Sequence, residues 1–203
     1  MPGSNFQADA LARLPPAGFR KQRDYFYLVR EPNLLVVYRK YNGAVFEGYY
    51  LAFTHTFFSN VQGPGGRYVM PPLLESYPVS LSITEIQAQF RRHDSIGAFD
   101  CDLNYVSRAT TAARTATPKS WLPAWLRMNH WFKRKGPSDG YSTDPVEVVL
   151  REGLRFMAQF SPAFTHRVLA AREGLNHPAI ARLTAECGQF LEGNNNARGA
   201  AVE

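Results

Sequence analysis

The chain has 203 residues, of which 45% are apolar and 13% aromatic, a size and composition suited to one domain with one substantial core. No window approaches the roughly 18–20 apolar residues of a membrane-spanning helix, and Asp9 and Arg13 interrupt the N-terminus, so we expect neither an anchor nor a signal peptide. Cys101 and Cys187 are too few for a disulfide framework, which leads us to expect a reducing, cytoplasmic environment.

The positive charge of the chain is local. The formal net charge is +6, and the acid-free segment 103–138 alone carries +7, so the rest of the chain sums to −1. All three tryptophans lie in the same segment. A general affinity of the whole surface for nucleic acid or acidic membranes is therefore not what the composition predicts.

The first half of the chain alternates between strand-like segments and turn residues. Apolar residues at helical spacing predict a helix over 5–14, which Pro15-Pro16 ends. Asn42-Gly43 is typical of a tight hairpin turn. Aromatic and β-branched runs predict an antiparallel meander with strands over 25–30, 34–41 and from Ala44 to Phe58. In the last strand, Tyr49, Leu51, Phe53 and Phe57 form one apolar face, opposite Ala52, Thr54 and Thr56.

A glycine-rich stretch then separates the meander from further elements. Residues 62–66 predict an exposed loop, and residues 77–83 a fourth strand. Thr84 and Gln87 fit a capping box for a short helix that ends near Arg92. We expect residues 96–106 to return to the sheet as a fifth strand.

Three helices with proline near their start are predicted to close the chain. Asp144-Pro145-Val146-Glu147 combines an N-cap, proline at the first helical position and a reciprocal glutamate. Ser161-Pro162 begins a second helix, ended by Gly174, and Pro178 begins a third. From Gly193 onward there is little to bury. We therefore predict a single α+β domain over residues 1–192, with an antiparallel sheet of four or five strands packed against an N-terminal helix and C-terminal helices, and a disordered tail over 193–203.

The tryptophan-rich basic segment is the main candidate binding surface. Large indole rings anchor protein interfaces, and cations around them favour an acidic partner. The predicted binding residues are Arg114, Lys119, Trp121, Trp125, Arg127, Trp131, Lys133, Arg134 and Lys135. A purely structural alternative is that the cations at Lys133–Lys135 complement the negative end of a helix dipole.

A second candidate is a pocket near His55 and Arg67. His55 interrupts an apolar strand face, which is typical of a buried, hydrogen-bonded histidine or of a ring that faces a pocket between the sheet and the helices. Arg67 follows the glycine-rich loop and is placed to hold an anion. Along a strand, Cys101 would point inward between Asp100 and Asp102.

The sequence predicts neither a metal nor a cofactor. No histidine or second cysteine lies at a ligand spacing from Cys101, and Gly63–Gly66 lacks the lysine and hydroxyl of a phosphate-binding loop. We expect a non-catalytic protein that binds an acidic protein partner. Two alternatives stay open: a small hydrolase or transferase with a cleft near His55, and a module for nucleic acid or anionic membranes.

The segment from Leu11 to Phe58 resembles an uncharacterised family of bacterial α+β domains. The resemblance rests on an opening helix, the turn Gly18-Phe19-Arg20-Lys21, the strand Tyr25-Phe26-Tyr27 and the following meander. It covers the first third to half of the chain and implies an α+β fold without an active site. Small domains of this kind often act as immunity proteins for secreted toxins, which by analogy implies an immunity-like or adaptor role.

Replacing Lys133, Arg134 and Lys135 by glutamine tests the predicted basic surface. We expect the variant to elute from an anionic matrix at lower salt than the wild type, because three cations of the predicted surface are lost. The measurement is the elution salt concentration of the two proteins side by side. Elution at the same salt would remove the electrostatic part of the hypothesis.

Overall fold

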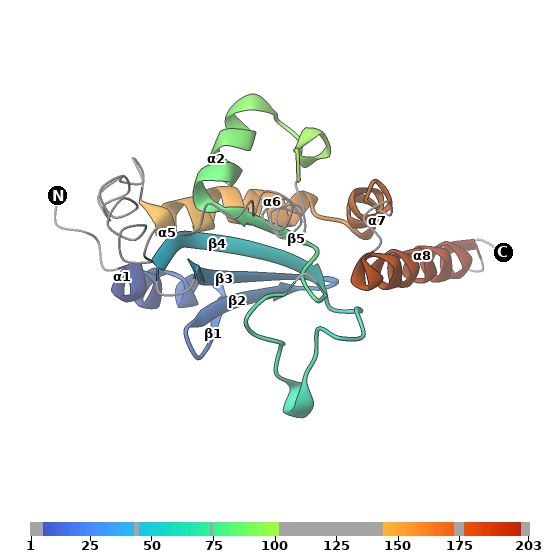
Figure 1. Ribbon diagram of the computed structural model, residues 1–203, viewed down its shortest axis with the longest axis horizontal. Coiled ribbons are helices and arrows are strands. Elements are labelled where there is room, and N and C mark those ends of the chain that lie inside the picture. Colours follow the sequence, from blue (N-terminus) through green and yellow to red (C-terminus); the bar gives the residue numbers. More distant parts are fainter. Residues whose placement is uncertain (1–5, 43–44, 74, 102–143, 173–176, 200–203) are drawn as a thin grey trace, which may run out of the picture.

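The computed structural model describes residues 6–42, 45–73, 75–101, 144–172 and 177–199 (Figure 1). One antiparallel sheet in sequential order contains β1 (Arg20–Gln22), β2 (Tyr25–Arg30), β3 (Asn33–Asn42), β4 (Val45–His55) and β5 (Val79–Ser82). The helices are α1 (Phe6–Arg13), α2 (Ile83–Arg92), α5 (Pro145–Val148), α6 (Leu154–Gln159), α7 (Pro162–Ala170) and α8 (Pro178–Gly199). Short turns of helix are η1 (Pro15–Ala17), η2 (Pro64–Gly66), η3 (Ile96–Ala98) and the π-helical η4 (Val149–Gly153). The predicted α+β fold, with its antiparallel sheet and its N-terminal and C-terminal helices, is confirmed.

The central strand β3 is buried on both faces. Four successive residues, Leu34 to Val37, are each at most 1% exposed. In β4, Leu51 and Phe53 on one face and Ala52 and Thr54 on the other are all fully buried. Successive side chains of a strand point to opposite faces, so both faces of this sheet must be covered.

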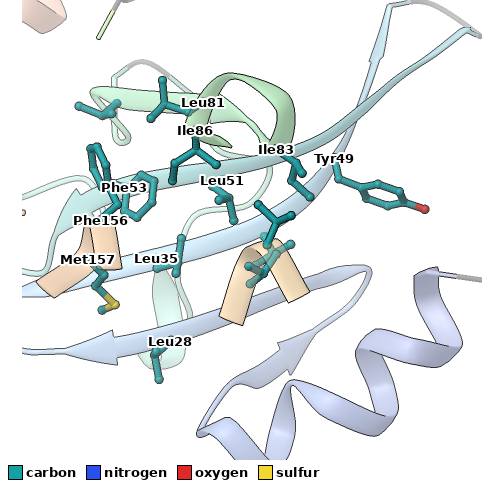
Figure 2. Close-up of a cluster of buried hydrophobic side chains, with 14 of the residues drawn as sticks. Leu28, Leu35, Tyr49, Leu51, Phe53, Leu81, Ile83, Ile86, Phe156 and Met157 are labelled. Atoms are coloured by element: carbon teal, nitrogen blue, oxygen red, sulfur yellow. The ribbon is translucent and has the colours of Figure 1, made fainter. Parts of the chain in front are cut away.

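Helices cover the first face of the sheet. Phe6, Ala10 and Leu14 come from α1 and the residue that follows it, and Ile83 and Ile86 come from α2. Figure 2 shows Phe156 and Met157 of α6 over Leu35, Leu51 and Phe53 of the sheet, and the Phe53 and Phe156 ring centroids are 4.3 Å apart. Burial of this cluster from α1 to α6 is the main apolar contribution to stability.

The second face is covered by the segment 56–78 and by α7 and α8. Leu34, Val36 and Ala52 of the sheet pack with Phe58, Val61 and Tyr77 from that segment. Leu169 of α7 and Ile180, Leu183 and Cys187 of α8 complete the cluster. The segment 56–78 runs from the end of β4 to the start of β5 and projects away from the sheet (Figure 1). A segment without long regular elements thus serves as one wall of the core.

The predicted helix starts at Asp144 and Ser161 are confirmed. Asp144 Oδ1 accepts a hydrogen bond from the Val146 N–H at 2.9 Å, and Ser161 Oγ accepts one from the Phe164 N–H at 3.2 Å. Arg13, at the end of α1, contacts Asp144 and also donates to Glu147 Oε2 at 2.9 Å. Partial burial acts to raise the pKa of Asp144, but the hydrogen bond and charge of Arg13, together with hydrogen bonds from the Val146 and Glu147 backbone, hold this pKa below its usual value.

Three local predictions were wrong. The capping box of α2 is formed by Ser82 and Glu85, two residues before the predicted pair. Residues 96–98 form the short helix η3 in place of a strand, and the fifth strand of the described sheet is β1, at the segment predicted as a turn. The helix α8 continues to Gly199, through residues 193–199 that the sequence predicted as part of a disordered tail.

The π-helical turn η4 brings Gly153 close to the sheet. A methyl group at this position would lie 3.4 Å from Leu51 Cδ1 and 3.9 Å from Leu35 Cδ2. Contacts of that length leave room for one carbon but not for a branched side chain. The glycine therefore sets how closely this helix approaches β3 and β4.

Gly153→Val is expected to lower the free energy of unfolding by about 1–3 kcal/mol, because the two extra methyl groups overpack the contact with Leu51. Gly193→Val is the matched control, since nothing lies within 4 Å of an added Cβ there. Urea denaturation of both variants measures the difference. Equal stability of the two variants would contradict the close packing of η4 against the sheet.

Candidate binding cleft

The predicted tryptophan-rich surface lies outside the described residues. This applies to every residue of that set, from Arg114 to Lys135. The predicted surface stays a prediction, and the structure places the other two candidates, His55 and Arg67, in very different surroundings.

His55 is a core residue. Its exposed fraction is 0%, and its ring is stacked against Phe160 at 4.5 Å and against Phe57 at 5.0 Å between centroids. The ring occupies the junction between the end of β4 and the helices α6 and α7. It does not line an open cavity among the described residues, so its position gives no support to a catalytic cleft there.

Two hydrogen bonds fix the ring of His55. Nδ1 lies 3.0 Å from Asn33 Oδ1, and Nε2 lies 2.7 Å from Thr165 Oγ1. The Asn33 amide nitrogen donates to the Phe160 carbonyl at 2.7 Å, which leaves Asn33 Oδ1 as the acceptor for the ring. A neutral ring that donates from Nδ1 and accepts the Thr165 hydroxyl proton at Nε2 satisfies every group.

Burial lowers the pKa of His55 to about 3, against a smaller opposing effect of a hydrogen bond with the Pro32 backbone. The neutral form is therefore the only one populated near neutral pH. The network joins the ends of β3 and β4 to α6 and α7, and its role in the described structure is to hold these elements together.

The two cysteines are also core groups. Cys101 is 5% exposed, inward as predicted, and Cys187 is fully buried. Burial raises the pKa of each thiol to about 12. A protonated, buried thiol is a poor nucleophile and a poor metal ligand. Within the described ranges, no group of three or more histidine, cysteine or carboxylate side chains gathers to hold a metal ion.

Arg67, in contrast, lines an open cleft of about 640 Å³. One wall is the β1–β2 hairpin, with Lys21, Gln22, Arg23 and Tyr27, and the other is the loop 63–70. The ten lining residues include three cations and no carboxylate: Lys21, Gln22, Arg23, Tyr27, Gly63, Pro64, Arg67, Tyr68, Val69 and Met70. Cations that are separated by more than forty positions in the sequence thus meet at one site.

One side-chain hydrogen bond, one ring contact and one backbone hydrogen bond position the two walls. Gln22 Nε2 donates to the Tyr68 carbonyl at 2.8 Å, and the rings of Tyr27 and Tyr68 are 5.2 Å apart in an edge-on arrangement. Across the loop, the Gly63 N–H donates to the Arg67 carbonyl at 2.7 Å. The tight reversal between these two residues needs positive φ at Gly65 (72°) and Gly66 (70°), a conformation that glycine adopts without strain.

The cations of the cleft are exposed and available. Within the described part of the chain, no hydrogen bond or ion pair engages the side chains of Lys21, Arg23 or Arg67. Two exposed acids, Asp24 and Glu31, lie near the cleft, and Asp24 is next to Arg23 in the sequence. Burial is the main cause of the raised pKa of Tyr68, and the negative charge of Glu31 adds to it. The cleft itself presents positive charge beside two tyrosine rings, a combination suited to an anionic group carried on a larger ligand.

The sequence predicted one of the three cations of this site. Arg67 was proposed to hold an anion, but Lys21 and Arg23 were missed, because the charge balance outside 103–138 averages out to −1. The run Arg20-Lys21-Gln22-Arg23 is a local concentration of positive charge that is visible in the sequence. This run forms a site only together with the loop 63–70, and the sequence does not show that the fold brings the two segments together.

Comparison of this chain with models of protein families, with curated proteins and with solved structures found no match. The resemblance of residues 11–58 to a bacterial family accordingly stays a prediction. None of the described helices is long and apolar enough to cross a membrane.

The buried histidine gives the fold a defined pH dependence. The folded-state pKa of about 3 lies below the ordinary value of 6.5, so protons bind the unfolded chain more tightly. The contribution of His55 to stability is complete above pH 6.5 and is lost as the pH falls toward 3, with a slope of up to about 1.4 kcal/mol per pH unit.

We expect His55→Gln to flatten this part of the pH dependence while it lowers stability at neutral pH by about 1–3 kcal/mol. Thr165→Val removes one hydrogen bond but keeps the ring, and is expected to retain the wild-type slope. Urea denaturation between neutral pH and pH 4.5 measures how the free energy of unfolding changes with pH in the wild type, His55→Gln and Thr165→Val. A slope in His55→Gln equal to that of the wild type would refute the assignment.

Proposed function

We propose that this chain is a non-catalytic binding protein that holds an acidic segment of a protein partner in the cleft between the β1–β2 hairpin and the loop 63–70. The observation that carries the proposal is the convergence of Lys21, Arg23 and Arg67, from two separate elements, around one open cleft. Each of these side chains is exposed.

The chemistry of the cleft favours carboxylate groups on a peptide. Arginine presents a planar fork of donors that matches a carboxylate in a bidentate manner, and lysine adds a point charge. Because no described ion pair occupies these cations, binding would not require the loss of an internal contact. Each exposed cation contributes little to affinity, so binding of the acidic segment requires several cations in the cleft.

Tyr27 and Tyr68 supply the apolar part of the site. Tyrosine rings bring contact area with little loss of side-chain entropy, and they are enriched at protein interfaces for this reason. Both rings are half-buried and already packed against each other, so little ordering is needed on binding. This favours a protein partner, and the immunity-like or adaptor role is carried over by analogy with the bacterial family alone.

The tryptophan-rich segment predicted from the sequence is a separate proposal for the same class of partner. It rests on composition, whereas the cleft rests on the arrangement of described residues. Variants of the two regions are independent and separate the two proposals.

Lys21→Gln, Arg23→Gln and Arg67→Gln, combined in one chain, are expected to weaken binding of a fluorescein-labelled oligoglutamate peptide by about tenfold or more, because three cations at about 0.5 kcal/mol each are removed. The matched control combines Arg30→Gln, Arg91→Gln and Arg92→Gln, which removes the same charge from exposed residues outside the cleft. Fluorescence anisotropy measures the two affinities.

Equal weakening in the cleft variant and the control would show that net charge alone attracts the peptide, and would refute the cleft. Oligothymidylate and anionic phosphatidylserine vesicles are titrated in parallel. Tighter, cleft-dependent binding of either probe would replace the acidic protein partner with nucleic acid or a membrane surface.

A further inference from the structure

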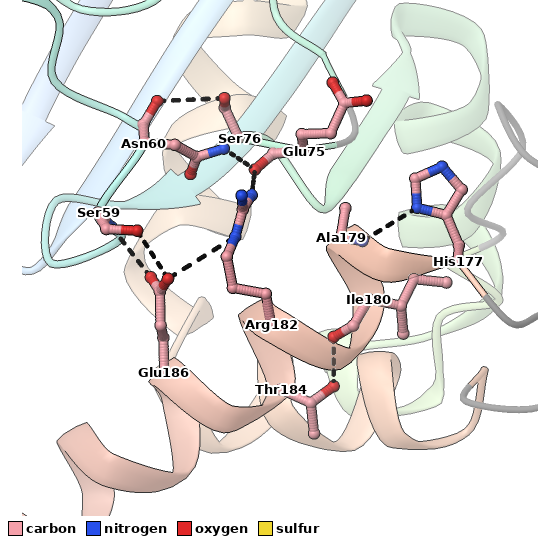
Figure 3. Close-up of polar contacts among 10 residues, drawn as sticks. All are labelled: Ser59, Asn60, Glu75, Ser76, His177, Ala179, Ile180, Arg182, Thr184 and Glu186. Carbon is pink, nitrogen blue, oxygen red and sulfur yellow. Dashed lines mark hydrogen bonds and ion pairs between the residues drawn. The ribbon is translucent and has the colours of Figure 1, made fainter.

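The loop that carries Arg67 and Tyr68 is closed at its base by two side chains of α8, Arg182 and Glu186, which we call the α8 clamp. Glu186 Oε2 accepts a hydrogen bond from the Ser59 N–H at 2.9 Å, and its Oε1 accepts one from the Ser59 hydroxyl at 2.7 Å. Arg182 Nη2 donates to the Glu75 carbonyl at 2.6 Å. Figure 3 shows both contacts side by side.

The two residues of the α8 clamp also contact each other. They are four positions apart on the helix, and Arg182 Nε lies 3.7 Å from Glu186 Oε1. One turn of α8 thus holds the residue near the start of the loop and the residue near its end. The spacing of the two loop ends is set by the spacing of two side chains on one rigid helix.

A second set of hydrogen bonds joins the loop ends directly. The Asn60 amide donates to the same Glu75 carbonyl, and the Ser76 hydroxyl donates to the Asn60 carbonyl at 3.3 Å. Thr54 of β4 in turn donates to the Ser76 carbonyl. The base of the loop is therefore tied to α8 on one side and to the sheet on the other.

We infer that Arg182 and Glu186 are positioning residues for the anion-binding cleft, although neither of them lines it. The inference rests on the proposed function of the cleft and identifies the residues that fix the ends of its loop wall. A loop with unfixed ends samples many conformations, and a ligand that binds it must restrict them at a cost in affinity. With its ends fixed, the loop presents Arg67 opposite Lys21 and Arg23 before a ligand arrives.

The helix α8 also contributes apolar contacts to the core through Ile180, Leu183 and Cys187. A merely structural role of the clamp would affect the docking of α8 but not the anion site. Two readouts separate these possibilities: opening of the loop, and affinity for the oligoglutamate peptide.

The experiment compares Glu186→Gln with Glu192→Gln. Both remove one negative charge from α8, but Glu192 is exposed and makes none of the clamp contacts. Trypsin cleavage after Arg67, an exposed residue within the closed loop, reports how often the loop opens. We expect Glu186→Gln to be cleaved there about tenfold faster than the wild type, because hydrogen bonds to a charged group are lost, and Glu192→Gln to be cleaved at the wild-type rate.

The same two variants are titrated with the oligoglutamate peptide. Weaker binding by Glu186→Gln, together with wild-type affinity in Glu192→Gln, supports the positioning role. Unchanged cleavage, or faster cleavage with unchanged affinity, overturns it. If Glu186→Gln fails to fold, Ser59→Ala removes one of the two bonds to Glu186 and gives the same two readouts.

Failure of the proposed function is recognised separately. A wild-type chain that does not bind the peptide refutes the function of the cleft, and with it the positioning of an anion site. The cleavage rate then still decides whether the α8 clamp closes the loop.

Discussion

The two-sided burial of β3 and β4 is the constraint from which the rest of this structure follows. Leu34 to Val37 form a continuous apolar run, so a sheet with one face open to water would expose half of them. Helices α1, α2, α5 and α6 cover one face. The other face is covered by α7, α8 and the segment 56–78, which has few regular elements of its own. That segment therefore serves both the core and the cleft.

The dual role explains how an irregular segment provides a defined wall. Phe58, Val61 and Tyr77 anchor it to the sheet through buried apolar contacts, and the half-buried Tyr68 packs against the same cluster. Arg67, which lies between Val61 and Tyr77, stays at the surface and lines the cleft. Polar contacts with Arg182 and Glu186 fix its ends. Apolar burial thus provides most of the free energy that holds this segment on the sheet, and the directional hydrogen bonds fix where its ends lie.

The features that sequence predicted well are local ones. Proline with a preceding Asp144 or Ser161 marks helix starts because one side chain satisfies the first free N–H groups, and this needs no distant partner. The predictions were wrong where several local signals competed, or where tertiary contacts determine the local conformation. Ser82 caps α2 in place of Thr84, and residues 96–98, with helical hydrogen bonds of their own, pack against the core without joining the sheet. The candidate site was predicted only in part, because Arg67 and the β1–β2 hairpin meet through the fold alone.

The most direct test of the proposed binding site is a backbone-amide NMR titration of the 203-residue chain with the oligoglutamate peptide. We predict chemical-shift changes that gather at residues 21–23 and 63–70 and spread to Ser59 and Glu75 at the base of the loop, with no change at His55 in the core. Shift changes confined to residues 103–138, or none at all, would contradict the assignment of the cleft as the binding site.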